Sequence, residues 1–91
     1  MRLAHNQILR ELQKLKDWKY ESGKIRREFM FPNFPTAVLF VNKLVDACEE
    51  IDHHPEITIR YNRVMLTLVD HAQGAVSDKD LKLVQLINDI L

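Results

Sequence analysis

The sequence predicts an α+β protein with the element order α-β-β-α-β-β-α, in which three helices pack on one face of a four-stranded antiparallel sheet. Apolar residues recur at helical spacing in three segments, and two pairs of strand-like segments are each joined by a short turn. Hairpins imply antiparallel pairing, and the amphipathic helices then cover the apolar face of the sheet. We expect residues 1–91 to form a single domain.

The first helix and the first hairpin come at the start of the chain. Apolar residues three and four positions apart, with charged residues between them, indicate the helix: Ile8, Leu9, Leu12 and Leu15. Ser22 and Gly23 then form a turn pair between two segments that contain aromatic or β-branched residues. The alternating apolar positions of these two segments are Trp18, Tyr20, Ile25, Phe29 and Phe31. The pattern predicts a β-hairpin that ends at Pro32.

The main helix is predicted in the segment "NFPTAVLFVNKLVDACEEI". Pro35 stands where a proline is favourable, in the first turn. A stripe with helical period follows, made of Val38, Val41, Leu44, Val45, Cys48 and Ile51, and Phe40 and Ala47 widen it. The stripe is broad enough to face both the sheet and a second subunit.

The second hairpin is predicted in "PEITIRYNRVMLTLVDH", with Asn62 and Arg63 as a two-residue turn. The expected pairs are Tyr61 with Val64, Ile59 with Leu66, and Ile57 with Leu68. All six side chains are apolar and fall on one face, so we expect that face to be buried. A last helix follows Gly74, with Ser77 as N-cap, Asp80 three residues later, and a stripe of Leu81, Val84, Ile87 and Leu91.

Composition excludes several functional classes. Hydrophobic residues make up 46% and charged residues 29% of the chain, as in ordinary globular proteins, and thirteen basic residues balance thirteen acidic ones. No net charge therefore favours binding to nucleic acid or to an anionic membrane. Cys48 is the only cysteine, which excludes an internal disulfide, and we expect it to be an inert core residue. No segment resembles a signal peptide or a membrane span, so we expect a soluble, cytoplasmic protein.

Two of the four histidines, His53 and His54, stand side by side before Pro55. When the expected register of the second hairpin is extended outward, His54 falls opposite His71. The proline weakens the strand ladder there and favours an extended conformation for the residue before it. We therefore expect His54 and His71 near one end of the sheet, on the face opposite the helices. Successive extended residues point to opposite sides, so His53 joins them only if the chain bends between the helix and the strand.

This histidine cluster allows three interpretations. Imidazole exchanges protons near neutral pH, so the three histidines beside Glu49 and Asp52 predict an acid–base site in which the carboxylates orient the imidazoles. Solvated histidines in a polar loop would give the same pattern. A zinc site is the third interpretation, but two adjacent histidines are poorly spaced for metal ligands, and we expect no metal.

At these residues the sequence resembles the pterin-4a-carbinolamine dehydratase family. The matching positions are Glu49, His53, His54, Pro55, Tyr61 and His71. The segments "IDHHPE", "YNRV", "SDKD" and "FMFPNF", together with Trp18 and Gly74, extend the resemblance over nearly the whole chain. The family has the same α-β-β-α-β-β-α order.

The resemblance implies dehydration of a 4a-hydroxytetrahydropterin to a quinonoid dihydropterin, the tetrahydrobiopterin recycling step that follows aromatic amino acid hydroxylation. One proton goes to the leaving hydroxyl oxygen and another is removed from a ring nitrogen, both of which histidines can do. No cofactor is needed, because the pterin is the substrate. The protein would then be a hydro-lyase.

The resemblance also marks individual residues. It makes His53, His54 and His71 the catalytic set, and the substrate-binding or orienting set becomes Glu49, Asp52, Pro55, Lys79 and Asp80. Two departures concern substrate preference: Ile57 stands where an aromatic residue is common, and Lys79 where an arginine is common.

The partners that the resemblance implies are a small-molecule pterin and further copies of this chain, as a homodimer or homotetramer joined through the main helix. A pterin-dependent hydroxylase or a transcription factor is a further possible partner. The alternative function is therefore a non-catalytic pterin-binding, dimerisation or coregulator protein on the same scaffold. The three histidines favour the enzyme, because a scaffold has no physical need of them.

Overall fold

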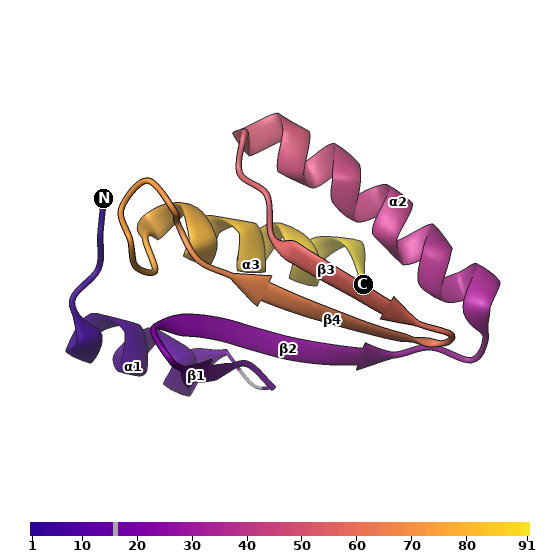
Figure 1. The fold of residues 1–91 in the computed structure, drawn as a ribbon, viewed down its shortest axis with the longest axis horizontal. Coiled ribbons are helices and arrows are strands. Elements are labelled where there is room, and N and C mark those ends of the chain that lie inside the picture. The colour runs from indigo at the N-terminus through magenta and orange to yellow at the C-terminus, as the bar shows by residue number, and fades with distance from the viewer. Residues whose placement is uncertain (16) are drawn as a thin grey trace.

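The protein is an antiparallel sheet with its helices on one side, as the sequence predicts (Figure 1). A computed structural model describes residues 1–15 and 17–91. The elements are α1 (His5–Lys14), β1 (Lys19–Glu21), β2 (Lys24–Met30), α2 (Phe34–Ile51), β3 (Glu56–Arg60), β4 (Arg63–Leu68) and α3 (Asp78–Ile90). The strands lie in the order β1-β2-β4-β3, and every neighbouring pair is antiparallel.

The core lies between the sheet and the helices, because β4 is central and presents its apolar face to them. Its fully buried side chains are Val64, Leu66 and Leu68, and they share one cluster with buried residues of all three helices: Ile8, Leu44, Cys48, Leu83, Val84 and Ile87. Phe29 of β2 adds aromatic contacts, edge-on to Trp18 at 6.2 Å and tilted against Phe40 of α2 at 5.0 Å between ring centroids. The expected burial of Cys48 is confirmed.

Local sequence explains where α2 begins and ends. The Asn33 side chain accepts a hydrogen bond from the Thr36 N–H at 2.9 Å, and Pro35 lies in the first turn, where no N–H is required. At the other end Asp52 adopts a left-handed conformation (φ 51°, ψ 49°) that stops the helix. None of the described helices is both long enough and apolar enough to cross a membrane.

The expected register of the second hairpin is wrong by two positions. The turn residues are Tyr61 and Asn62, so Ile59 pairs with Val64 rather than with Leu66. Contacts with the β2–α2 connection explain the difference: the Asn62 side chain donates to the Phe31 carbonyl, and the Phe31 N–H donates to the Asn62 carbonyl, both at 2.9 Å. These bonds hold Asn62 outside the ladder.

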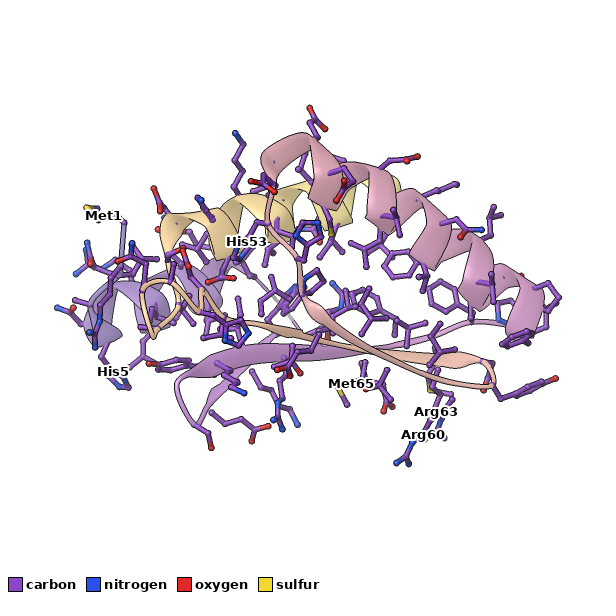
Figure 2. The ribbon with its side chains drawn as sticks, turned by 45° about the horizontal axis from the view of Figure 1, so that its top comes forward. Met1, His5, His53, Arg60, Arg63 and Met65 are labelled. Atoms are coloured by element: carbon purple, nitrogen blue, oxygen red, sulfur yellow. The ribbon has the colours of Figure 1, made fainter. Side chains whose placement is uncertain are left out.

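The expectation that both strands of this hairpin are buried holds only for β4. Ile57 and Ile59 are 37% and 40% exposed, and Tyr61 is 70% exposed. β3 is the edge strand, and the helices pack chiefly over the centre of the sheet. None of the described helices covers the opposite face of the sheet, and Figure 2 shows Arg60, Arg63 and Met65 pointing away from the helices there.

Candidate active site

The candidate active site lies where the connection from α2 to β3 passes the first turn of α3 and the loop that follows β4 (Figure 1). Figure 2 shows His53 on that connection, between the end of α2 and the helix α3. The expected pairing of His54 with His71 is wrong, because the register differs and the β3 ladder begins only at Glu56. His53 and His54 lie on the connection from α2 to β3, and His71 lies on the loop that follows β4.

The end of α2 turns the two adjacent histidines in different directions. The Asp52 N–H donates to the Glu49 carbonyl, and the His53 N–H donates to the Cys48 carbonyl at 3.1 Å. Asp52, directly before the two histidines, has the left-handed conformation that ends the helix; beyond it His53 is buried whereas His54 is exposed. The backbone of Asp52 therefore ends the helix. Pro55 is half-buried and restricts the backbone conformation of His54, the residue before it.

His53 is bound to a buried carboxylate. Its Nε2 lies 2.5 Å from Oδ1 of Asp80, whose side chain is fully buried, and His53 itself is only 9% exposed. The other carboxylate oxygen, Oδ2, accepts the backbone N–H of Ser77 at 2.9 Å. Burial raises the pKa of the Asp80 carboxyl above its ordinary value, although the hydrogen bonds from His53 and Ser77 favour the ionised form.

The Asp80 carboxylate fixes the orientation of the His53 ring. An ionised carboxylate only accepts hydrogen bonds, so the Nε2–H of His53 donates to it and Nδ1 is left outside this bond. The sequence places Asp80 correctly in the capping box of α3. That Asp80 also reaches His53 could not be deduced from the helix-capping pattern.

His54 forms a second imidazole–carboxylate pair, with Glu49. Its Nε2 lies 2.5 Å from Oε2 of Glu49, and the two side chains are 56% and 69% exposed. Such an exposed pair adds little stability, because water screens it. It nevertheless orients the ring in the same way as the first pair, with Nε2 engaged.

His71 lies on an exposed loop closed by its own backbone. The Asp70 N–H donates to the Ala75 carbonyl at 3.0 Å, and the Ala75 N–H donates back to the Asp70 carbonyl at 3.3 Å. Gly74 takes a left-handed conformation (φ 66°) that the tight loop requires. Among the described residues, no hydrogen bond or ion pair links His71 to His54.

Lys79 contributes its backbone to this region. Its N–H donates to the Ser77 side-chain oxygen at 3.2 Å, which caps α3, while its side chain is exposed to solvent near the site. Two further polar residues here are buried, Asp70 and Ser77, at 6% and 0% exposure. The sequence predicts Ser77 as the N-cap of α3, which is confirmed, but it does not predict that either residue is part of the site. The position of Asp70 directly before His71 was the one available signal.

The candidate active site is a surface site. A hollow of about 690 Å³ lies elsewhere, beside the part of β2 that does not pair with β1. The residues that line it include Arg27, Phe29 and Phe31 but no histidine. Within residues 1–15 and 17–91, no group of three histidine, cysteine, aspartate or glutamate side chains could hold a metal ion.

The fold and this site define a class of protein: small α+β proteins in which adjacent histidines, each oriented by a carboxylate, follow the long helix. The chain belongs to the pterin 4 alpha carbinolamine dehydratase family, whose sequence profile matches residues 1–90.

Relatives cover almost the full chain. A protein from Sulfolobus acidocaldarius, provisionally named a pterin-4-alpha-carbinolamine dehydratase, is 42% identical over 90 residues, which is 99% of each chain. A protein from Picosynechococcus with the same provisional name is 43% identical over 82 residues, covering 90% of this chain and 89% of that one.

Solved structures agree with the fold. The crystal structure of a transcriptional coactivator/pterin dehydratase from Brucella melitensis superposes with a TM-score of 0.94 at 34% identity, covering 99% of this chain and 98% of that one. A pterin dehydratase-like protein described as a RuBisCO assembly factor in the alpha-carboxysome shares the fold, with a TM-score of 0.65 at 18% identity over 80% of this chain and 84% of that one.

Proposed function

We propose that this protein dehydrates a 4a-hydroxytetrahydropterin to a quinonoid dihydropterin by histidine acid–base catalysis. The observation that carries the proposal is the pair of adjacent imidazoles, His53 and His54, each held at 2.5 Å by a carboxylate. In both rings Nε2 is engaged, so Nδ1 is the nitrogen left for proton exchange. Family membership supplies the substrate class.

The reaction needs two proton transfers. One imidazolium gives a proton to the 4a-hydroxyl oxygen as the C4a–O bond breaks, and the hydroxyl leaves as water. A neutral imidazole takes the proton from the adjacent ring nitrogen, which then forms the double bond to C4a. Exchange with solvent restores both histidines, and no electron leaves the pterin. His71, exposed on its loop, is the third member of the set.

The carboxylates have an orienting role in this proposal. Asp80 and Glu49 fix the tautomers of His53 and His54, and they stabilise the positive charge that forms on a ring when it takes a proton. Neither step requires a metal or a held cofactor, and we place this pterin recycling step in the cytoplasm.

The test compares the dehydration rate of enzymatically generated 4a-hydroxytetrahydropterin with wild type, His53→Ala, His54→Ala and His71→Ala. We expect wild type to accelerate the reaction strongly, and folded variants to lose about 10²-fold or more of that acceleration. His5→Ala is the matched control, because His5 lies in α1 against the Tyr20 ring and is not one of the three proposed catalytic histidines. Equal rates in all four histidine variants would contradict the proposal.

Self-association through α2 is a further part of the proposal. The outer surface of this helix exposes Phe34, Leu39 and Val45, at 48%, 54% and 47%. Contact with another copy would remove these apolar side chains from water, so we expect a homodimer or homotetramer. Analytical ultracentrifugation at micromolar concentration checks this: Leu39→Lys should shift the mass towards the monomer, and a monomeric wild type would contradict it.

The same surface favours a second candidate function, binding of a partner such as a pterin-dependent hydroxylase or a transcription factor. The relative from Brucella melitensis is described as both a transcriptional coactivator and a pterin dehydratase. The two functions separate cleanly, because a binding role through α2 should survive the histidine substitutions whereas dehydration should not.

A further inference from the structure

Four buried polar residues lie between the loop that carries His71 and the ring of His53. They are Asp70, Ser77, Asp80 and His53, which are 6%, 0%, 0% and 9% exposed. Buried polar groups cost free energy unless they are hydrogen-bonded, so a group of four in a chain of this size calls for a reason.

The first link is Asp70, which holds the His71 loop from within. Its side-chain Oδ1 accepts the Ala72 N–H at 3.1 Å, and its backbone carbonyl accepts the N–H groups of Gln73 and Ala75 at 3.0 and 3.3 Å. The pKa of Asp70 is lowered despite its burial, first by hydrogen bonding from the Ser77 side chain and then by the Gln73 N–H, the charge of His53 and the Ala72 N–H.

The second link is Ser77, the N-cap of α3. Its side-chain oxygen accepts the Lys79 N–H at 3.2 Å, and its backbone N–H donates to Oδ2 of Asp80 at 2.9 Å. Oδ1 of Asp80 in turn binds His53 Nε2. Hydrogen bonds thus link Ser77 to Asp80 and Asp80 to His53.

We propose that Asp70 and Ser77 are positioning residues, which hold His71 at a fixed distance and orientation from His53 through the first turn of α3. This inference rests on the proposed dehydratase function and deepens it. Neither residue needs to touch the pterin, since both are buried.

Capping the loop does not by itself explain why residue 70 is an aspartate. Asparagine or serine would accept the Ala72 N–H equally well, in the same type of turn. The carboxylate adds a cost, because its negative charge disfavours ionisation of the neighbouring Asp80. What the charge adds is attraction to the Ser77 side chain, the largest of the effects that lower the pKa of Asp70, and Ser77 begins the helix that carries Asp80.

Kinetics of Asp70→Ala in two backgrounds test the inference. In the otherwise wild-type chain we expect kcat to fall about tenfold or more with KM changed less than about twofold, because binding is intact and His71 is misplaced. In the His71→Ala background, the same substitution should cost less than about twofold, since the group it positions is already absent. Asp89→Asn, an exposed acidic residue in the last turn of α3, is the control and should leave kcat unchanged.

Two kinetic results would overturn the inference. One is a kcat within about twofold of wild type for Asp70→Ala, and the other is the same loss in both backgrounds. If Asp70→Ala does not fold, Asp70→Asn replaces it in both backgrounds. The expected fall in kcat is then about threefold rather than tenfold, because the asparagine side-chain oxygen keeps the bond to the Ala72 N–H. The same loss in both backgrounds would again overturn the inference.

Histidine-ring NMR separates this inference from the dehydratase proposal. Asp70→Ala, or Asp70→Asn in its place, should shift the ring signals of both His71 and His53 and speed hydrogen exchange at the Ala72 and Ala75 amides, whereas Asp89→Asn should not. An inactive wild type with these shifts would reject the dehydratase function and keep the structural link. Unchanged ring signals would overturn the link, whatever the activity.

Discussion

Asp80→Asn is the most informative single substitution in the site. The Ser77 N–H will hold the oxygen of the new amide side chain, because an N–H group requires an acceptor and bonds Oδ2 of the native carboxylate at 2.9 Å. The amide NH₂ group then takes the place of Oδ1 and faces Nε2 of His53. Two donors cannot share one hydrogen bond, so the neutral His53 ring must move its proton to Nδ1.

The magnitude follows from this change of tautomer. The proton-exchanging nitrogen is now blocked by its own proton, and we expect kcat to fall by about 10²-fold or more, the range of a lost general acid or base. Stability should change far less. Two charge-assisted hydrogen bonds become neutral ones, but the burial that raises the pKa of Asp80 no longer opposes a charge, so we expect a net loss of about 1 kcal/mol. In a chain of this length that lowers Tm by about 4–8 °C.

The assay has two parts, carried out on the same protein samples. Long-range nitrogen–proton NMR on the histidine rings identifies which nitrogen of His53 carries the proton, and stopped-flow kinetics give kcat. Asp89→Asn again serves as the control, because it makes the same chemical change at an exposed position of the same helix. If His53 keeps its proton on Nε2 in Asp80→Asn and kcat stays within about threefold of wild type, the orienting role of Asp80 is refuted.

Three further predictions concern the neighbouring groups. Glu49→Gln should cost less than about 1 kcal/mol in urea unfolding, because the pair with His54 is exposed, yet it should lower kcat about tenfold by releasing that ring. Burial, aided by the charge of Glu49, raises the pKa of Cys48 to about 11, so iodoacetamide at pH 8 should leave its thiol almost unmodified until the protein is unfolded; rapid labelling of the native protein would contradict this. The pKa of Asp70 is lower in the folded protein than the ordinary 3.8, so its stabilisation is present above that value and is lost as the pH falls through the folded pKa. The free energy of unfolding of Asp70→Asn, measured by urea titration at a series of acidic pH values, should therefore depend less on pH than that of wild type, and parallel curves would count against it.

The sequence predicts the fold well because local signals and burial patterns agree. Helical stripes, the Ser22-Gly23 turn and the Ser77 capping box each specify one local structure, and their order leaves an antiparallel sheet as the simple solution. The register of the second hairpin fails for a long-range reason. Alternation is unchanged when a strand slips by two residues, and the contact of Asn62 with Phe31, distant in sequence, favours the observed pairing.

In the candidate site, too, neighbours in the sequence could be predicted and long-range contacts could not. Adjacent histidines before a proline, with Glu49 one helical turn earlier, could be read from the sequence, and the structure joins His54 to Glu49. The buried partner of His53 could not be read, because Asp80 is distant in sequence and its helix-capping role already explains its presence. Asp70 was missed because burial of a carboxylate depends on how the loop folds onto α3.

The most direct measurement is the single-turnover and steady-state dehydration rate of a 4a-hydroxytetrahydropterin in the presence of the wild-type protein. We expect many turnovers per protein molecule at a rate well above that of the spontaneous reaction, and loss of that rate in folded His53→Ala. A protein that binds the pterin but leaves the spontaneous rate unchanged would contradict the proposed catalysis and leave this chain as a binding protein on a dehydratase scaffold.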